Sequence, residues 1–123
     1  MLDHVSIQCA DIAESVSFYD AVLAPLGASR VFDLGAVIGY GVDGHPSFWL
    51  GPLVDQGTNR PMHVGFVAPD RAAVEAFFAA AQEMGAEVLH EPRVFNEYHP
   101  KYFAAYGRDP NGHNVEAVYR PKV

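Results

Sequence analysis

The sequence predicts an α+β fold in which two βαβββ modules form a curved half-barrel sheet around a cleft. The first observation is an internal repeat, because a segment near the N-terminus recurs at a constant offset of 59 residues. Its matched pairs are His4–His63, Val5–Val64, Asp11–Asp70 and Phe18–Phe77. The second is that both copies change from strand-like to helix-like patterning at the same point. Self-similarity in a fixed order is the mark of a duplicated architecture.

Each copy begins with a short apolar strand and continues into a helix. The predicted strands cover residues 4–9 and 63–68, which are apolar and β-rich. An aspartate follows each strand where a helix N-cap is expected, and a glycine ends each helical pattern at the left-handed C′ position. These residues are Asp11 and Gly27 in the first copy and Asp70 and Gly85 in the second.

Three further strands follow each helix, separated by turn residues. They are predicted at Ser29–Leu34, Ala36–Tyr40 and Ser47–Leu50, and then at Glu87–Glu91, Tyr102–Gly107 and Asn114–Tyr119. The turn at 109–112, Asp-Pro-Asn-Gly, is a strong signal because proline fixes one φ and glycine tolerates a positive one. Residues 92–101 are expected to form a longer loop that overhangs the sheet.

The chain therefore divides into module one at 1–52, a linker at 53–60 and module two at 61–123. One helix with about four strands leaves an apolar face that the unit cannot cover alone, so two units must pair. Pairing within the chain and pairing across a dimer are both compatible with the sequence.

Composition restricts the class of partner. The chain has 123 residues, 50% hydrophobic and 19% charged, with a net charge of −7. This acidic balance argues against nucleic acid or an anionic membrane as a partner. The single cysteine, Cys9, rules out an internal disulfide and fits a reducing compartment. With no secretory signal and no apolar stretch of membrane-spanning length, the cytoplasm is the expected location.

Three stretches carry a family resemblance: DHVSIQCADIAESVSFYDAVLAPLG in the first copy, and MHVGFVA and YFAAYGRDPNGHNVEAVYR in the second. They resemble the vicinal-oxygen-chelate superfamily, which includes glyoxalase I, extradiol dioxygenases, fosfomycin-resistance enzymes and bleomycin-binding proteins. The first stretch resembles that family's first strand and helix. The other two look like its second unit, in which a DP-x-G turn leads into a strand with a metal-binding glutamate. The resemblance covers almost the whole chain and implies a small-molecule substrate or ligand.

The resemblance implies a metal site at His4, His63 and Glu116. Glyoxalase I would add a carboxylate near the end of the first unit. In this chain the matching position is Trp49 or one of its neighbours in SFWLG, with no Asp or Glu, which argues against lactoylglutathione lyase itself. A set of two histidines and one carboxylate suits Zn²⁺, Ni²⁺, Mn²⁺ or Fe²⁺ and leaves coordination positions open for substrate or water.

The alternative is that both histidines are hydrogen-bonded strand residues in a cleft. Glu116 would then be solvated or paired with Arg108 or Arg120.

A loop at 96–102 provides candidate catalytic residues. Tyr98 and His99 combine a phenol and an imidazole that could orient a substrate or move a proton. The alternative is a proline-stiffened surface loop whose tyrosines pack on the sheet rim. His45 and His113 are expected to be solvated, and His90 has no assigned role.

Aromatic side chains on the predicted strands are candidate substrate-binding residues, and core packing is their ordinary alternative. They are Phe48, Trp49, Phe66, Tyr102 and Phe103.

Three functions are compatible with these features. The first is a metal-dependent enzyme that acts on a small oxygenated substrate by lyase, isomerase, dioxygenase or transferase chemistry. The second is a metal-free protein that sequesters a small molecule, as bleomycin-resistance proteins do. The third is an enzyme that has lost its metal and works through Tyr98 and His99. A homodimer is expected.

Overall fold

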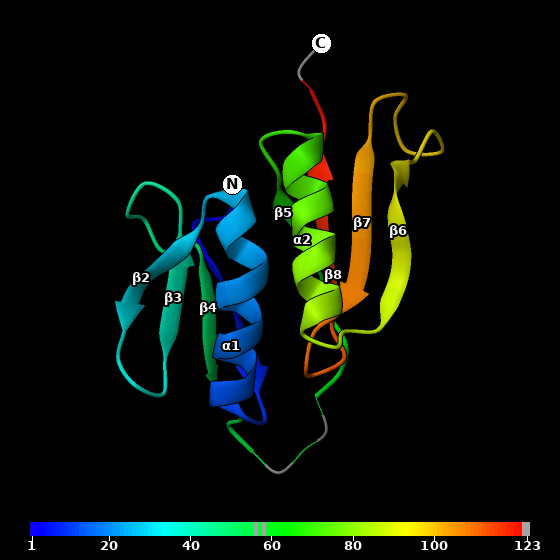
Figure 1. Ribbon diagram of the computed structural model, residues 1–123. Coiled ribbons are helices and arrows are strands. Elements are labelled where there is room, and N and C mark those ends of the chain that lie inside the picture. The colour runs from blue at the N-terminus through cyan, green and yellow to red at the C-terminus, as the bar shows by residue number, and fades with distance from the viewer. Residues whose placement is uncertain (56, 58, 122–123) are drawn as a thin grey trace.

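The computed structural model describes residues 1–55, 57 and 59–121, and it shows two βαβββ modules side by side (Figure 1). Module one contains β1 (Val5–Cys9), α1 (Ile12–Leu23), a 3-10 turn (Ala24–Leu26), β2 (Ser29–Asp33), β3 (Ile38–Gly41) and β4 (Phe48–Pro52). Module two contains β5 (His63–Val67), α2 (Arg71–Glu83), β6 (Val88–Val94), β7 (Phe103–Arg108) and β8 (Asn114–Tyr119). The predicted linker, 53–60, includes positions 56 and 58, which lie outside the described residues.

The strands form two four-stranded sheets, with the order β1-β4-β3-β2 in sheet A and β5-β8-β7-β6 in sheet B. In each sheet the first strand pairs with the last strand of its module in parallel, and the other pairs are antiparallel. The predicted α+β fold of two βαβββ modules is confirmed. Its strands belong to two open sheets, because β1 and β5 are each an edge strand.

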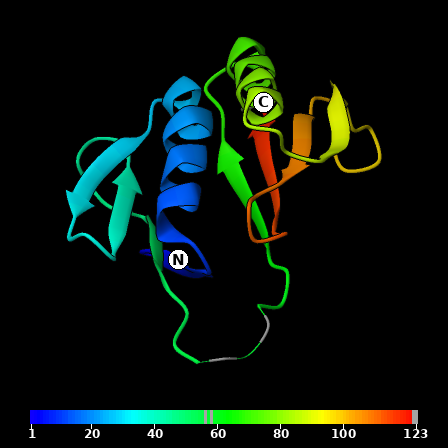
Figure 2. The same ribbon diagram turned by 60° about the horizontal axis from the view of Figure 1, so that its bottom comes forward.

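The two helices lie next to each other and cover the same side of the molecule (Figures 1 and 2). The main core lies between these helices and the sheets, so the opposite face of each sheet is left open. Its largest members include Phe18, Tyr19, Leu23, Leu50, Phe77 and Val115. Within the described part of the chain, no helix is long and apolar enough to cross a membrane.

The helix boundaries follow the predicted capping residues. The Asp11 carboxylate accepts a hydrogen bond from the Glu14 backbone N–H at 3.1 Å, and that of Asp70 accepts one from Ala73 at 2.7 Å. Gly27 follows the 3-10 turn with φ of 86° and Gly85 follows α2 with φ of 78°, the left-handed conformation that glycine adopts at no steric cost.

The predicted loop at 92–101 is shorter than expected, because β6 continues to Val94. This strand contains Pro92, although proline is normally excluded from central strands. However, β6 is the edge strand of sheet B, and its register with β7 shifts between His90 and Arg93. Pro92 therefore lies where its missing N–H breaks no ladder hydrogen bond. The strand ends only when Val94 has paired with Phe103.

A turn from module two is held against α1 of module one by buried and partly buried hydrogen bonds. We call this set of bonds, formed by Ser15, Tyr19, Asp109, Asn111 and His113, the module clasp. The Tyr19 hydroxyl donates to Asp109 Oδ2 at 2.7 Å. Asp109 Oδ1 accepts from the backbone N–H groups of Asn111 and His113, both at 2.9 Å. Asn111 reaches further into module one, where its Nδ2 donates to Ser15 Oγ at 3.0 Å. The clasp fixes the turn that leads directly into β8.

The expectation that His113 is solvated is wrong, because its side chain is 1% exposed. Its Nδ1 accepts a hydrogen bond from the Met62 backbone N–H at 2.9 Å, which joins the start of β8 to the start of β5. His45 is exposed as expected.

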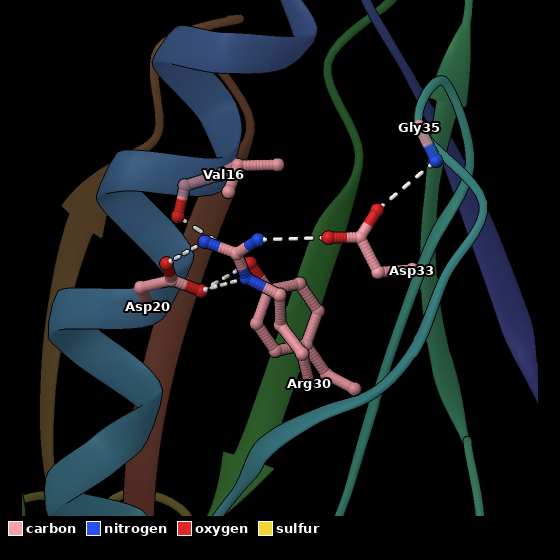
Figure 3. Close-up of polar contacts among 6 residues, drawn as sticks. Val16, Asp20, Arg30, Asp33 and Gly35 are labelled. Atoms are coloured by element: carbon pink, nitrogen blue, oxygen red, sulfur yellow. Dashed lines mark hydrogen bonds and ion pairs between the residues drawn. The ribbon is translucent and has the colours of Figure 1, made fainter.

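A surface ion-pair network joins α1 to sheet A (Figure 3). The Arg30 guanidinium pairs with Asp20 through two nitrogens and donates to Asp33 Oδ2 at 3.1 Å. The Tyr40 hydroxyl also donates to Asp20, at 2.9 Å. These donors, Arg30 above all, hold the pKa of the Asp20 carboxyl below its ordinary value.

Replacing Asp20 by asparagine is expected to lower stability at pH 7 by about 0.5–1 kcal/mol, since the ion pair is partly exposed. The folded pKa of Asp20 lies below its unfolded value of about 3.9, so its contribution is complete above that pH and is lost as the pH falls through the folded pKa. Urea unfolding at pH 7 and at pH 3 measures this: the difference from the unmodified chain should shrink at pH 3. Asp43→Asn, in an exposed turn, is the matched control. A difference that stays constant between the two pH values would contradict the prediction.

Candidate functional site

A cavity of about 530 Å³ lies over the open face of sheet B. Strand alternation explains its position, since Val115 and Ala117 of β8 enter the core below α2 and Glu116 between them points to the other face. We call this cavity the sheet B pocket. It is lined by His63, His90, Phe95, Tyr98, Tyr102, Tyr106, Asn114 and Glu116.

A histidine and a carboxylate form the polar centre of the sheet B pocket. His63 Nε2 and Glu116 Oε1 are 2.7 Å apart, and the Tyr102 hydroxyl donates to Glu116 Oε2 at 2.8 Å. The Glu116 side chain is 6% exposed, whereas that of His63 is 50% exposed. Both carboxylate oxygens are therefore held from inside the protein, and the imidazole remains open to a ligand.

A glycine makes room for this arrangement. Gly65 of β5 pairs with Glu116 of β8, and a Cβ at Gly65 would lie 3.3 Å from both Cγ and Oε1 of Glu116. Any larger side chain would press on the carboxylate. The glycine thus lets Glu116 extend across β5 to His63.

Aromatic rings form the walls of the pocket. Tyr106 lies between two imidazoles, stacked with His63 at 6.0 Å between ring centroids and edge-to-face with His90 at 5.3 Å. Phe95 stacks with Tyr98 at 6.0 Å, and Tyr98 meets Tyr102 edge-to-face at 5.3 Å. Tyr98 is 66% exposed, so it stands at the mouth of the pocket.

The two tyrosines beside the carboxylate have raised pKa values. Burial and then the hydrogen bond to Glu116 raise the pKa of Tyr102. Burial, the neighbouring Tyr102 hydroxyl and the charge of Glu116 raise the pKa of Tyr106 well above its ordinary value. Both phenols therefore stay protonated at neutral pH, so they can donate hydrogen bonds but carry no charge.

His4, the third ligand implied by the resemblance, lies elsewhere. It directly precedes β1, its Nδ1 bonds to the Asp3 carboxylate at 2.7 Å, and its side chain is 55% exposed. Among the described residues, no three His, Cys, Asp or Glu side chains are grouped closely enough to hold a metal ion. The structure thus brings His63 and Glu116 together in one chain but does not bring His4 to them, so one chain alone does not fit a three-ligand centre.

The register of the strands shows what module one has in place of the carboxylate. Ser6 pairs with Trp49 in sheet A as Gly65 pairs with Glu116 in sheet B, and Ser6 and Gly65 are repeat partners. Trp49 therefore stands at the position equivalent to Glu116. Its indole lies over Gly39, where a Cβ would come within 2.9 Å of the ring, and stacks on Phe32 at 5.8 Å.

The other predicted substrate-binding residues are divided among different environments. Tyr102 lines the sheet B pocket, as described above. Phe48 and Phe66 meet edge-to-face at 5.0 Å and line a second cavity, of about 310 Å³, between the modules. Phe103 is buried in the main core, with the Arg71 guanidinium 4.7 Å from its ring centroid.

The two predicted catalytic residues also differ in position. Tyr98 lines the sheet B pocket. His99 is half-buried within its own loop, where Nδ1 accepts a hydrogen bond from the Lys101 backbone N–H at 3.1 Å, and it is not part of the pocket lining. The catalytic roles of both stay predictions.

Sequence reasoning missed four residues of the pocket lining: His90, Phe95, Tyr106 and Asn114. Two of them had a usable signal. Asn114 lies two positions before Glu116 on the same strand, which places both on one face. Tyr106 pairs directly with Glu116 across β7 and β8. His90 and Phe95 depend on the bulged register of β6, which the sequence does not show.

These features define a two-module domain of the glyoxalase-like class, with a polar centre on the open face of one sheet. The chain belongs to the Glyoxalase/Bleomycin resistance protein/Dioxygenase superfamily, whose model matches residues 1–117. No curated protein matches it.

Several solved structures share the fold. A glyoxalase/bleomycin resistance protein from Albidiferax ferrireducens is 27% identical with a TM-score of 0.86, and the match covers 98% of this chain and 99% of that one. A glyoxalase-related enzyme from Fulvimarina pelagi is 19% identical with a TM-score of 0.75, covering 98% and 88%. Lactoylglutathione lyase from Agrobacterium tumefaciens is 20% identical with a TM-score of 0.69, covering 97% and 92%. At these last two identities the likeness concerns the fold alone.

Proposed function

We propose that the protein is an enzyme that holds a small oxygenated substrate in the sheet B pocket and moves a proton on it through His63. The observation that supports this most directly is the hydrogen-bonded series from Tyr102 to Glu116 to His63 on the pocket floor. Isomerase and lyase reactions of carbonyl compounds need such a proton transfer next to the carbonyl group.

The partners of His63 give its two nitrogens different roles. An ionised carboxylate can only accept hydrogen bonds, so Nε2, which faces Glu116, carries the ring proton. Nδ1 then has a free lone pair with which to take a proton from a substrate. Glu116 would hold the ring in this tautomer and stabilise the imidazolium that forms, while remaining ionised itself.

Tyr98 and Tyr102 are suited to orienting the substrate. Tyr98 presents an exposed ring at the mouth of the pocket, where a planar substrate can stack on it. Tyr102 is fixed by its bond to Glu116. We propose that Tyr98 acts on the substrate through contact and not as the base.

Hydrogen–deuterium exchange tests this proposal. The protein is incubated in D₂O with small aromatic ketones, with and without an amino group, and NMR follows exchange at the carbon next to the carbonyl. We expect exchange faster than in buffer, saturable with ketone concentration. Saturable binding without faster exchange would overturn the proton transfer and favour the second candidate below, a binding protein. Failure of every ketone to bind would overturn the pocket itself.

A metal-free sequestering protein, similar to bleomycin-resistance proteins, is that second candidate. It is favoured by the large aromatic share of the pocket lining, which binds planar molecules without needing chemistry. For such a protein, the His63–Glu116 pair would serve only as a hydrogen-bonding anchor.

A metal-dependent form of the enzyme requires a second copy of the chain. His4 is the repeat counterpart of His63, and in a homodimer His4 of a second copy could join His63 and Glu116 as the third ligand. A Zn²⁺, Ni²⁺, Mn²⁺ or Fe²⁺ ion bound there would polarise a substrate oxygen and permit dioxygenase or transferase chemistry.

Metal content after chelator-free purification tests this dimeric centre. If it exists, we expect about one divalent ion per chain, lost in both His4→Ala and His63→Ala, in a protein that light scattering shows to be dimeric. Unchanged metal content in His4→Ala would exclude a ligand from a second copy. Failure to take up any of the four ions on soaking would contradict the centre altogether.

A further inference from the structure

We infer that the sheet B pocket selects planar ligands that carry a positive charge and discriminates against anions. This names the ligand class of the proposed function and rests on the pocket being the binding site. The inference depends on the charge, the rings and the size of the lining.

Among the described residues that line the sheet B pocket, Glu116 is the only Asp, Glu, Lys or Arg. Among the described residues, its one ion-pair partner is His63, and its other oxygen accepts from the neutral Tyr102 hydroxyl. Buried carboxylates are normally paired with lysine or arginine, so this site keeps a negative charge that a ligand can balance. A carboxylate has about four acceptor positions and two are used here, which leaves room for a donor from the ligand.

The rings reinforce this preference. Phe95, Tyr98, Tyr102 and Tyr106 line one cavity, and aromatic faces attract cations. Two arginines that are not part of the pocket lining already make cation–π contacts with rings of this cluster. The Arg93 guanidinium lies 3.6 Å from the Phe95 ring centroid, and the Arg120 guanidinium lies 5.6 Å from the Tyr102 ring centroid. A ligand cation inside the pocket would make the same kind of contact.

An anion would find no Lys or Arg among the described residues of the lining, because Arg93 and Arg120 contact rings of the cluster from outside it. A proton on His63 only makes a neutral pair with Glu116, so His90 is the one further described lining group that could become positive. A carboxylate or phosphate on the ligand would also lie close to the like charge of Glu116, which is repulsive. The net charge of −7 repels anions at longer range.

The size of the cavity limits the ligand. A volume of about 530 Å³ accommodates one or two rings with a short side chain. The charged group would sit against Glu116 at the floor, and the ring would lie between Tyr98 and Tyr106. The sheet B pocket therefore fits an arylalkyl amine or a similar planar cation.

Three matched probes test the inference: 2-phenylethylamine, 2-phenylethanol and 3-phenylpropanoate, which share a ring and a chain but differ in charge. Isothermal titration calorimetry at pH 7.5 in a chelating buffer gives their affinities. We expect the amine to bind at least about tenfold more tightly than the anion, with the alcohol between them. Glu116→Gln keeps the shape and should reduce this preference to within about threefold. Glu75→Gln, on the exposed side of α2 and outside the pocket lining, is the matched control and should leave it unchanged.

The Tyr98→Ala variant separates the contribution of the Tyr98 ring to binding from the contribution of the Glu116 charge. Because Tyr98 is largely exposed, its removal should leave the fold intact and weaken all three probes, and the amine should still be preferred because Glu116 remains. An anion that binds as tightly as the amine would overturn the charge selection but leave the pocket proposal standing. A preference for the amine that survives in Glu116→Gln would show that the carboxylate is not its source. No binding of any probe would remove the pocket proposal and this inference together.

Discussion

Replacing His63 by glutamine is expected to slow proton exchange at a bound ketone by about 10²–10⁴-fold while changing affinity only slightly. Glutamine can still donate a hydrogen bond to Glu116, which now accepts one from His63, so the carboxylate keeps a partner. It has no nitrogen that can take up a proton in place of Nδ1. Exchange rates by NMR and affinities by calorimetry, on the same samples, give both quantities.

Two other histidines serve as comparisons for this variant. His45→Gln changes an exposed residue of module one and should have no effect on exchange. His99→Gln tests the role predicted for the loop residue, which the His63 proposal expects to be small. If His99→Gln lost exchange fully while His63→Gln retained it, the proton transfer would have to be assigned to the loop residue His99 and not to the strand residue His63.

Replacing Asp109 by alanine is expected to lower the free energy of unfolding by about 3–5 kcal/mol. Its carboxylate accepts three hydrogen bonds inside the module clasp, and its side chain is buried. Alanine would leave the Tyr19 hydroxyl and two backbone N–H groups without an acceptor, and each such buried donor costs about 1–3 kcal/mol. Urea unfolding monitored by circular dichroism provides the measurement.

Tyr19→Phe is the matched comparison, because it removes one of the three hydrogen bonds and leaves the ring in the core. The expected loss is about 1–2 kcal/mol. If Asp109→Ala cost no more than Tyr19→Phe, the two backbone donors would have to find other acceptors, and the clasp would be a weaker link between the modules than the hydrogen bonds indicate.

Local signals predicted the fold well because each module repeats them. Asp11 and Asp70 cap their helices, and Gly27 and Gly85 adopt the left-handed conformation where the pattern required it. These features depend on a few neighbouring residues, and a duplicated sequence presents each one twice. The repeat matched His63 only to His4, and it was the family resemblance that grouped His63 with Glu116. The two side chains lie 2.7 Å apart, and their role as metal ligands stays a prediction.

The pocket lining was harder to predict because it depends on which face each strand residue occupies. Tyr102 and Phe103 were both expected to bind substrate, yet adjacent residues of an extended chain point to opposite faces, so only Tyr102 lines the pocket. Phe48 and Trp49 are also adjacent and point to opposite faces of sheet A. Phe48 lines the cavity between the modules, and Trp49 stacks on Phe32. The contacts of His90 depend on the bulged register between β6 and β7, and a single sequence does not contain that information.

Sheets A and B share no strand pairing within the described residues, so the halves of the chain meet as packed surfaces, much as two subunits do. Packing of this kind does not depend on which linker joins the two partners. A chain cut between its halves should therefore reassemble from two fragments in a concentration-dependent way, and halves of different chains could trade places without altering either sheet.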